Sequence, residues 1–273
     1  MNTPIQPASP SALESDLALL IDAVREAGAL ALTFFGNAPH SEIKPDGTAV
    51  SEADLAVDAL LKARLLQGSH NAYGWLSEES EDTLERLNHT RVWIVDPIDG
   101  TRAFLKGKPE WTISAALVED GRSLLAAVFN PAVNEFYHAA RGGGAFLNGA
   151  RMKVCEPVKL EGCRLAASAT LFRPGRWDRP WPEIKTMWVN SIAYRLALVA
   201  AGTCDGTISL SAKNDWDIAA AHLLVEEACG IITTHDAQPL VYNRENTRHR
   251  SIVSAGPALH AALIERTWRQ TIA

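Results

Sequence analysis

The sequence predicts an α+β half followed by an α/β half, with a cleft between them. Strand-like segments gather between residues 73 and 140, and strands alternate with helices from about residue 165 onward. In addition, two carboxylates lie where an apolar segment ends. Because sheets bury their faces against helices and ligand sites form between such units, we expect a layered molecule with its chemistry between the halves.

Size and composition are those of a globular protein. The 273 residues suffice for one large domain or two ordinary ones, and 47% of them are hydrophobic. The net charge of −6 and the lack of a basic stripe argue against a nucleic-acid binder. We expect a disordered tail over residues 1–12, an α+β half over 13–148 carrying most of the site, and an α/β half over 149–273.

The cysteines and the amino-terminal residues carry no targeting or redox signal. The four cysteines lack paired CxxC spacing, which predicts buried, reduced thiols. Residues 1–10 lack the cationic start and apolar core of a signal peptide. No apolar run reaches the roughly 18 residues of a membrane span. We therefore expect a cytoplasmic protein with no membrane partner.

Helical spacing and turn residues define the elements of the first half. Leu17, Leu20 and Val24 recur at helical spacing, and Ser51 is a natural cap for a second helix. Apolar runs separated by turn residues predict strands. The expected order is a helix over 13–35, a turn and extended piece over 44–50, a helix over 51–66, and strands over 73–76, 91–95, 112–118, 124–130 and 135–140.

The second half alternates between helices and strands. Gly202 and Gly230 follow apolar helical segments and are natural stops. The expected order is a strand over 165–167, a Pro- and Trp-rich loop or short helix over 172–184, a helix over 192–201, a strand over 206–210, a helix over 215–229, strands over 231–233 and 251–254, and a final helix from Pro257.

The most informative segment is Asp96-Pro97-Ile98-Asp99-Gly100-Thr101, which follows an apolar strand. Asp is disfavoured in strands, whereas Pro and Gly let the chain turn so that both carboxylates converge on one point. Two converging carboxylates repel each other unless a cation lies between them, and oxygen ligands suit Mg²⁺. The alternative is an ordinary surface turn.

Further acids lie at the ends of predicted elements: Glu78 and Glu79 after a strand, and Asp54 and Asp217 in the first turns of helices. Each has an ordinary explanation, because a charge run is usually solvated and the helix dipole favours acids in a first turn. Asp215 is expected to be solvated. Taken together with the Asp96 segment, however, these positions predict a metal site.

These acids belong to four blocks that resemble the inositol monophosphatase superfamily of Mg²⁺-dependent, lithium-sensitive phosphatases. The blocks follow the family's order and cover nearly the whole chain from about residue 15. They are Lys44-x-Asp46-x-Thr48-x-Val50-Ser51-x-Ala53-Asp54, Ser77-Glu78-Glu79-Ser80, Trp93 to Thr101, and Trp216-Asp217 with Ala219 to Gly230. The resemblance implies the family's layered αβαβα sandwich and is compatible with a homodimer.

The resemblance also implies site roles. About two or three Mg²⁺ ions, which Mn²⁺ can replace, would be held by side chains and one backbone carbonyl. These ligands would be Glu78, Asp96, Asp99, Asp217 and the carbonyl of Ile98. Asp54 and Thr101 would orient the attacking water together with Glu78. Backbone amides of Gly100, Thr101 and Arg102 would cradle the phosphate.

Within the superfamily, the segment after the metal turn favours one branch. Simple inositol monophosphatases usually continue with Thr-Asn-Phe and His. This chain reads Thr101-Arg102-Ala103-Phe104-Leu105-Lys106 and then Glu110-Trp111-Thr112, similar to the 3′(2′),5′-bisphosphate nucleotidase branch. Ala103 departs from the Glu of that branch.

A bisphosphate needs a second centre of positive charge besides the metals. Arg195 and Lys213 are the candidates, although Arg195 could also be an exposed helix residue. Ser168 and Ser191 could contact sugar or phosphate, or could cap helices. Tyr194 could stack on adenine or belong to the core.

The sequence therefore predicts a phosphomonoesterase whose preferred substrate is adenosine 3′,5′-bisphosphate, hydrolysed to AMP and phosphate in the clearance of a by-product of sulfate assimilation. The alternatives within the same chemistry are inositol-1-phosphate, fructose-1,6-bisphosphate and histidinol phosphate. A non-catalytic phosphate-binding protein is the alternative from another class. The pairing of Thr101 with Asp54 argues against it, because binding alone does not require that pair.

Overall fold

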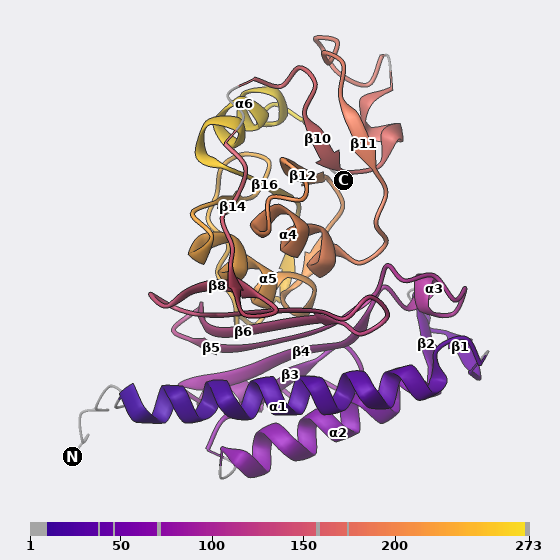
Figure 1. The fold of residues 1–273 in the computed structure, drawn as a ribbon, viewed down its shortest axis with the longest axis vertical. Coiled ribbons are helices and arrows are strands. Elements are labelled where there is room, and N and C mark those ends of the chain that lie inside the picture. Colours follow the sequence, from indigo (N-terminus) through magenta and orange to yellow (C-terminus); the bar gives the residue numbers. More distant parts are fainter. Residues whose placement is uncertain are drawn as a thin grey trace.

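Two β-sheets alternate with three layers of helices (Figure 1). The computed structural model describes residues 10–37, 39–45, 47–69, 72–156, 159–173 and 175–270. Most of the expected tail and Asp46 of the first motif lie outside these residues. The layers are α1 with α2, a seven-stranded sheet, α4 with α5, a five-stranded sheet, and α6. This is the expected αβαβα sandwich.

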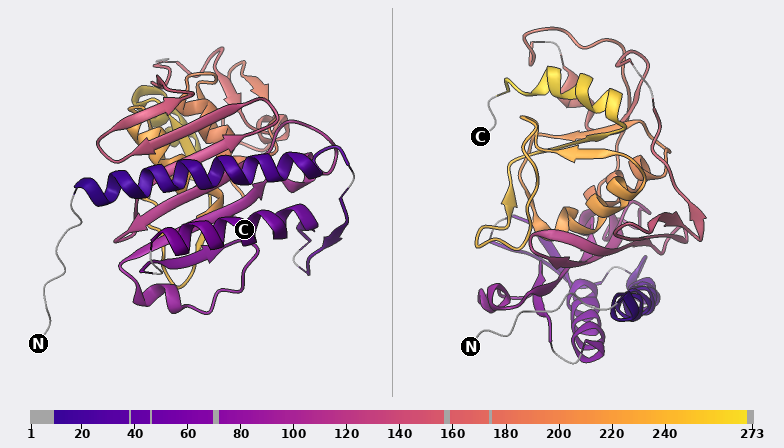
Figure 2. Two further views of the ribbon diagram at one scale, coloured as in Figure 1. Left: turned by 60° about the horizontal axis from the view of Figure 1, so that its bottom comes forward. Right: turned by 90° about the vertical axis from the view of Figure 1, so that its left-hand side faces the viewer.

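The outer helices of the first layer, α1 (Pro10–Phe34) and α2 (Glu52–Gly68), lie side by side on one face of the large sheet (Figure 2). Helix α1 begins three residues before the predicted start, since Pro is tolerated in a first helical turn. Its buried stripe, which includes Leu20, Val24 and Ala27, packs on the sheet. Between the two helices, β1 (Ser41–Ile43) and β2 (Ala49–Ser51) form an antiparallel pair.

The large sheet follows chain order from β3 to β9 and is antiparallel except where β3 and β4 pair. Its strands are β3 (Gly74–Ser77), β4 (Arg91–Asp99), β5 (Thr112–Glu119), β6 (Arg122–Asn130), β7 (Glu135–Ala140), β8 (Gly144–Leu147) and β9 (Ala150–Arg151). The five predicted strands are confirmed, although β4 runs four residues beyond its expected end at 95. The short strands β8 and β9 were not predicted, and they extend this sheet past residue 148.

The middle layer consists of α4 (Ile192–Ala200) and α5 (Asp215–Glu227), which lie between the two sheets. Every residue of α4 is buried. A helix that is apolar on most sides is stable only when it is covered on all of them, which explains its central place. The packing of these helices against the large sheet forms the largest apolar cluster, which places the start of α5 over the ends of β4 and β5.

The small sheet has the order β11-β10-β12-β16-β14, and α6 (Pro257–Thr267) packs on its far side. Its strands are β10 (Arg164–Ala166), β11 (Lys185–Met187), β12 (Gly206–Ser209), β14 (Ile231–Thr233) and β16 (Ile252–Ala255). Strand β11 was not predicted. A separate pair, β13 (Lys213–Asn214) with β15 (Arg248–His249), lies beside the start of α5.

Three further expectations concern the cysteines, the residue that ends α5, and membrane-spanning helices. All four thiols are free, and Cys163 and Cys204 are buried as expected. Cys155 is half-buried and Cys229 is exposed, so the prediction of buried cysteines is wrong at Cys229 and holds only in part at Cys155. Cys229 has a φ of 66° and ends the α5 segment in the left-handed conformation that was expected of Gly230. None of the helices in the described part of the chain has the length and apolar character needed to cross a bilayer.

Candidate metal centre

A β-bulge brings Asp96 and Asp99 to the same face of the large sheet. In a regular strand, residues three apart point to opposite faces. Here Asp96 pairs with Ser114 and Asp99 with Thr112, so three steps along β4 match two along β5. The extra residue restores the alignment, and both carboxylates face the second half of the chain. Convergence was expected from a turn after the strand; it arises instead from a bulge within it.

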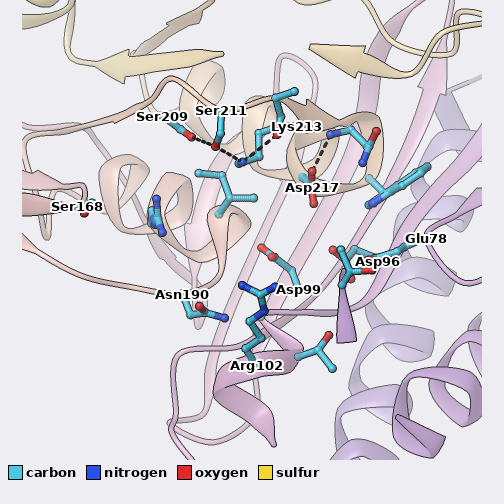
Figure 3. A pocket seen from close by; sticks show the side chains of 18 of the residues that line it. Glu78, Asp96, Asp99, Arg102, Ser168, Asn190, Ser209, Ser211, Lys213 and Asp217 are labelled. Atoms are coloured by element: carbon cyan, nitrogen blue, oxygen red, sulfur yellow. Dashed lines mark hydrogen bonds between the residues drawn. The ribbon is translucent and has the colours of Figure 1, made fainter. Parts of the chain in front are cut away.

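The first and second halves meet in an acidic cluster. Carboxylate oxygens of Asp96, Asp99 and Asp217 lie within 4.8 Å of one another. Burial has the largest effect on the pKa of Asp96 and raises it, and the negative charge of Glu78 raises it further. Figure 3 shows all four side chains around one cavity of about 960 Å³. The four side-chain ligands expected from the sequence are therefore brought together, and Ile98 also lines the cavity.

The donor set fits a divalent cation. Asp96 is 1% exposed; its Oδ1 accepts a hydrogen bond from the Ile98 amide at 3.1 Å, whereas its buried Oδ2 has no partner among the described residues. Burying an ionised carboxylate without a partner is costly, so a missing positive charge is indicated. Hard oxygen donors suit Mg²⁺. We propose that Glu78, Asp96, Asp99, Asp217 and the Ile98 carbonyl hold it.

Asp54 and Asp217 each cap a helix; Asp217 also lines the cavity, and Asp54 contacts Thr101, which lines it. Both occupy the third position of a helix, and the Oδ2 atom of each accepts the backbone N–H of the capping residue: Ser51 at 2.8 Å and Asn214 at 2.6 Å. That bond fixes the carboxylate and leaves Oδ1 for other partners. The ordinary explanation of a first-turn acid is confirmed for both residues, and their functional roles stay predictions.

Thr101 lies between Asp54 and the bulge. Its Oγ1 is 3.0 Å from Asp54 Oδ1 and 3.0 Å from the Ile98 carbonyl oxygen, so one hydroxyl proton is shared between two acceptors. Burial raises the pKa of Asp54, although bonds from Ser51 and Thr101 oppose the effect. Gly100, with a φ of 101°, makes the turn before Thr101, and a Cβ there would lie 2.8 Å from the Glu110 carbonyl oxygen.

Asp99 is held from the second half of the chain. Its Oδ2 accepts the Ser191 hydroxyl at 2.6 Å and the Ala193 amide at 2.6 Å, both at the start of α4. Ser191 is fully buried and also caps α4 through the Tyr194 amide at 2.9 Å. The expectation that Ser191 contacts substrate is therefore corrected: its hydroxyl is occupied in orienting Asp99.

Lys44 and Glu79 form a charged pair beside the cluster. The Nζ of Lys44 donates to Glu79 at 2.7 Å and lies 3.7 Å from Glu78. The Glu79 side chain is only 4% exposed, so a solvent-facing role is excluded. Because Glu79 keeps the ammonium next to Glu78, the expected orienting role of Glu79 fits its position.

Removing metal should make stability depend on pH. Burial, followed by neighbouring acids, raises the pKa of Glu78 to about 8, and burial raises that of Asp217 to about 7. The folded state thus keeps protons that the unfolded chain releases above about pH 4 to 5, so the free energy of unfolding falls as pH rises towards 8. We expect the Tm in EDTA to be several degrees lower at pH 8 than at pH 6, and Mg²⁺ to reduce the difference.

Differential scanning fluorimetry at both pH values tests this expectation, with Glu78→Gln as the matched variant. Because the amide cannot titrate, its Tm in EDTA should fall less between pH 6 and pH 8. Equal pH dependence of the wild type and Glu78→Gln would contradict the assignment of the proton uptake to this cluster.

Two cations line the same cavity as the carboxylates. Arg195 is 7% exposed, and its Nε donates to the Val189 carbonyl oxygen at 2.6 Å, so it is not an exposed helix residue. Lys213 donates to Ser211 Oγ at 2.9 Å and to the Ala212 carbonyl oxygen at 3.0 Å. Burial lowers the pKa of Lys213, and the charge of Arg195 lowers it further against the opposing effect of Asp217. Both cations line the cavity.

The other predicted substrate contacts line the cavity at different distances from the acids. Arg102 is exposed at the rim, where its Nη2 donates to the Gly47 carbonyl oxygen at 3.0 Å. Ser168 caps the 3₁₀ helix Ala169–Phe172, yet it also lines the cavity, on the side away from the acids (Figure 3). Gly100 and Thr101 line the cavity at the start of the short helix α3 (Thr101–Phe104).

Asp215 and Tyr194 lie in the interior. Asp215 is 1% exposed and contacts His249 Nε2 at 2.7 Å, so the expectation of a solvated side chain is wrong. That contact ties the start of α5 to β15. The Tyr194 hydroxyl donates to Glu135 at 2.8 Å, and its ring meets Tyr137, which confirms core packing rather than a surface for adenine.

The structure adds cavity residues that the sequence did not indicate. They follow the 3₁₀ helix Ala169–Phe172, β11 and β12, or belong to β15: Arg176, Trp188, Asn190, Leu210 and Arg248. No motif marks them, because they reach the cavity only through the packing of the small sheet on α4. The one available signal was the Pro- and Trp-rich segment 172–184, which we interpreted as a loop or short helix and which ends before Trp188.

Comparison with known proteins agrees with this geometry. The model of the inositol monophosphatase family matches residues 12–271. An inositol-1-monophosphatase of Mesorhizobium japonicum is 31% identical over 91% of this chain and 94% of its own length. The Nus factor SuhB of Escherichia coli is 32% identical over 80% of this chain and 84% of its own.

Among solved structures, the IMPase of Thermotoga maritima has a TM-score of 0.78 at 29% identity, over 91% of this chain and 95% of that one. The shared fold, the match to the family along nearly the whole chain and the acidic cluster lead to one conclusion. This chain belongs to the inositol monophosphatase family, whose members are metal-dependent phosphatases.

Proposed function

We propose that this phosphatase is a Mg²⁺-dependent 3′(2′),5′-bisphosphate nucleotidase that converts adenosine 3′,5′-bisphosphate to AMP and phosphate. One observation carries the proposal: four carboxylates and two cations, the buried Arg195 and the half-buried Lys213, line a single cavity. The hydrogen bonds of Arg195 and Lys213 are to neutral groups, and the acids that influence their pKa, Asp99 and Asp217, are proposed metal ligands. These cations are therefore available to a second phosphate.

The chemistry follows from the positions of the side chains. When bound, divalent ions neutralise the reacting phosphate and lower the pKa of water. Thr101 Oγ1, held by Asp54, fixes the orientation of the attacking water and passes its proton towards the carboxylate. The water oxygen bonds to phosphorus, the ester P–O bond breaks, and the leaving ribose oxygen takes up a proton. Arg195 and Lys213 hold the phosphate that does not react.

Inositol-1-monophosphatase is the second candidate, because several similar proteins bear that name. A monophosphate leaves the second group of cations without an anionic partner. Two more cations at the rim, Arg176 and Arg248, make that surplus larger. The charge distribution of the cavity thus supports the bisphosphate, whereas the names of the relatives support inositol phosphate.

A substrate panel in Mg²⁺ separates the candidates. Since hydrogen bonds to charged groups contribute about 1.5–3 kcal/mol each, we expect kcat/KM for adenosine 3′,5′-bisphosphate to exceed that for inositol-1-phosphate by at least about tenfold. Fructose-1,6-bisphosphate and histidinol phosphate complete the panel. A preference for inositol-1-phosphate by the same factor would overturn the nucleotide assignment.

A pair of variants at Lys213 tests the origin of that preference. Lys213→Gln keeps a polar side chain, one atom shorter, but removes its charge, so the advantage of the bisphosphate should shrink. Lys213→Arg keeps the charge and should retain most of it. Equal losses on mono- and bisphosphates in Lys213→Gln would mean that Lys213 does not bind the second phosphate.

A further inference from the structure

An exposed indole lies at the edge of the cavity. Trp188 directly follows strand β11, lines the cavity, and is 59% exposed, although the other large aromatic side chains of that region are at least partly covered. Leaving so much indole surface in water forfeits the free energy of its burial. Within a cavity, such a surface indicates a partner that covers it when bound.

One face of the ring is already occupied. The Arg195 guanidinium carbon lies 4.4 Å from the centre of the Trp188 ring, and Arg195 is itself fixed by the Val189 carbonyl oxygen. Arg195 is 7% exposed, so the cation lies beneath the indole rather than in solvent. No aromatic side chain of the described residues stacks on Trp188, and 59% of the residue stays exposed, so a large area of the indole is free to contact a ligand.

Part of the cavity wall is apolar. Leu171, Ile192, Ile208 and Leu210 contribute to it. A polyol placed against this wall would lose hydrogen bonds to water without replacing them, which is unfavourable. A flat ring buries apolar area there and offers a π-face to the indole.

On the basis of the proposed function, we propose that Trp188 is the specificity-determining residue that stacks on the heteroaromatic base of a nucleotide substrate. Arg195 lies under the other face of the same ring and reaches the second phosphate, so one unit recognises both parts of the substrate. Tyr194, the candidate for this role in the sequence, is excluded by its buried position and its bond to Glu135.

The test compares ligands with and without the base. We measure Kd by calorimetry for AMP and for ribose 5-phosphate, together with kcat/KM for adenosine 3′,5′-bisphosphate and for inositol-1-phosphate. In Trp188→Ala, the preference for AMP over ribose 5-phosphate should fall by roughly 5- to 150-fold, the usual loss of a stacking side chain. Trp188→Phe keeps a π-face and should retain most of the preference.

Trp268→Ala is the matched control. Trp268 is 51% exposed and also has a guanidinium above its ring, that of Arg269 at 4.7 Å, but it lies at the end of α6, outside the cavity. This variant should keep the preference of the wild type. The oligomeric state of both alanine variants is measured by analytical ultracentrifugation.

The outcomes separate this inference from the proposed function. If adenosine 3′,5′-bisphosphate is preferred by the wild type but Trp188→Ala keeps the AMP preference, Trp188 does not read the base and the proposed function stands. If the wild type prefers inositol-1-phosphate but Trp188→Ala still loses the AMP preference, the base site stands and the proposed substrate is wrong. Equal weakening of both ligands, or a changed oligomeric state with an unchanged preference, overturns the inference.

Discussion

Asp96→Asn is expected to lower kcat/KM by more than about 100-fold, because changes even to groups behind metal ligands cost about 10- to 100-fold. The amide keeps the shape and the Oδ1 acceptor for the Ile98 amide but removes the charge from a fully buried site. Without that charge, the three remaining carboxylates are a weaker site for a divalent cation. Steady-state hydrolysis over a range of Mg²⁺ concentrations measures the loss.

The same variant should remain folded. Burial and neighbouring acids raise the pKa of Asp96 well above its ordinary range. Ionisation of this carboxyl is therefore unfavourable in the folded wild type without metal. Asparagine removes that conflict, and we expect the Tm of Asp96→Asn in EDTA to equal or exceed that of the wild type. If the folded variant hydrolysed substrate at the wild-type rate, the assignment of Asp96 to the metal would be wrong.

Thr101→Val is expected to lower kcat by about 10²- to 10⁴-fold, the range of general acid–base catalysis. Valine has nearly the volume of threonine but no hydroxyl, so the link between the cavity and Asp54 Oδ1 is lost. Asp54 keeps its bonds from Ser51, which should preserve the start of α2. Because the hydroxyl acts on the water and not on the substrate, KM should change much less than kcat.

Thr101→Ser is the control for that experiment. It restores the hydroxyl at the cost of one methyl group and should recover most of the activity, measured under the same conditions as Thr101→Val. Undiminished kcat in Thr101→Val with unchanged Tm would show that Thr101 only ends the bulge through its contact with Ile98. Another group would then have to activate the attacking water.

The acids of the site could be predicted from the sequence because their positions are local facts. Asp96 and Asp99 follow an apolar strand, and Asp54 and Asp217 open helices that their own neighbours cap. The β-bulge was not predicted. Nothing within β4 reveals that the pairing with β5 shifts by one residue, since register is a property of two strands.

Residues of the second half were harder to assign. The hydroxyl group of Ser191 made it a candidate for a substrate contact, but its burial against Asp99 gives it a different role. Asp215 looked like a solvated charge and lies in the interior next to His249. Trp188 carries no motif at all. The cytoplasmic location, the homodimer and the division of the chain at residue 148 stay predictions.

By itself, the sequence determined most of the helices and strands and the acids that can bind metal, because helical and strand periodicity, caps and carboxylates after strands are encoded within a few residues. Its resemblance to the inositol monophosphatase superfamily implied the layered fold. Only the tertiary structure decided which side chains face the cavity. The packing of the small sheet on α4 and α5 places Arg195, Lys213 and Trp188 in the same cavity as the acids. That placement depends on contacts between segments about a hundred residues apart, which no local pattern of the chain contains.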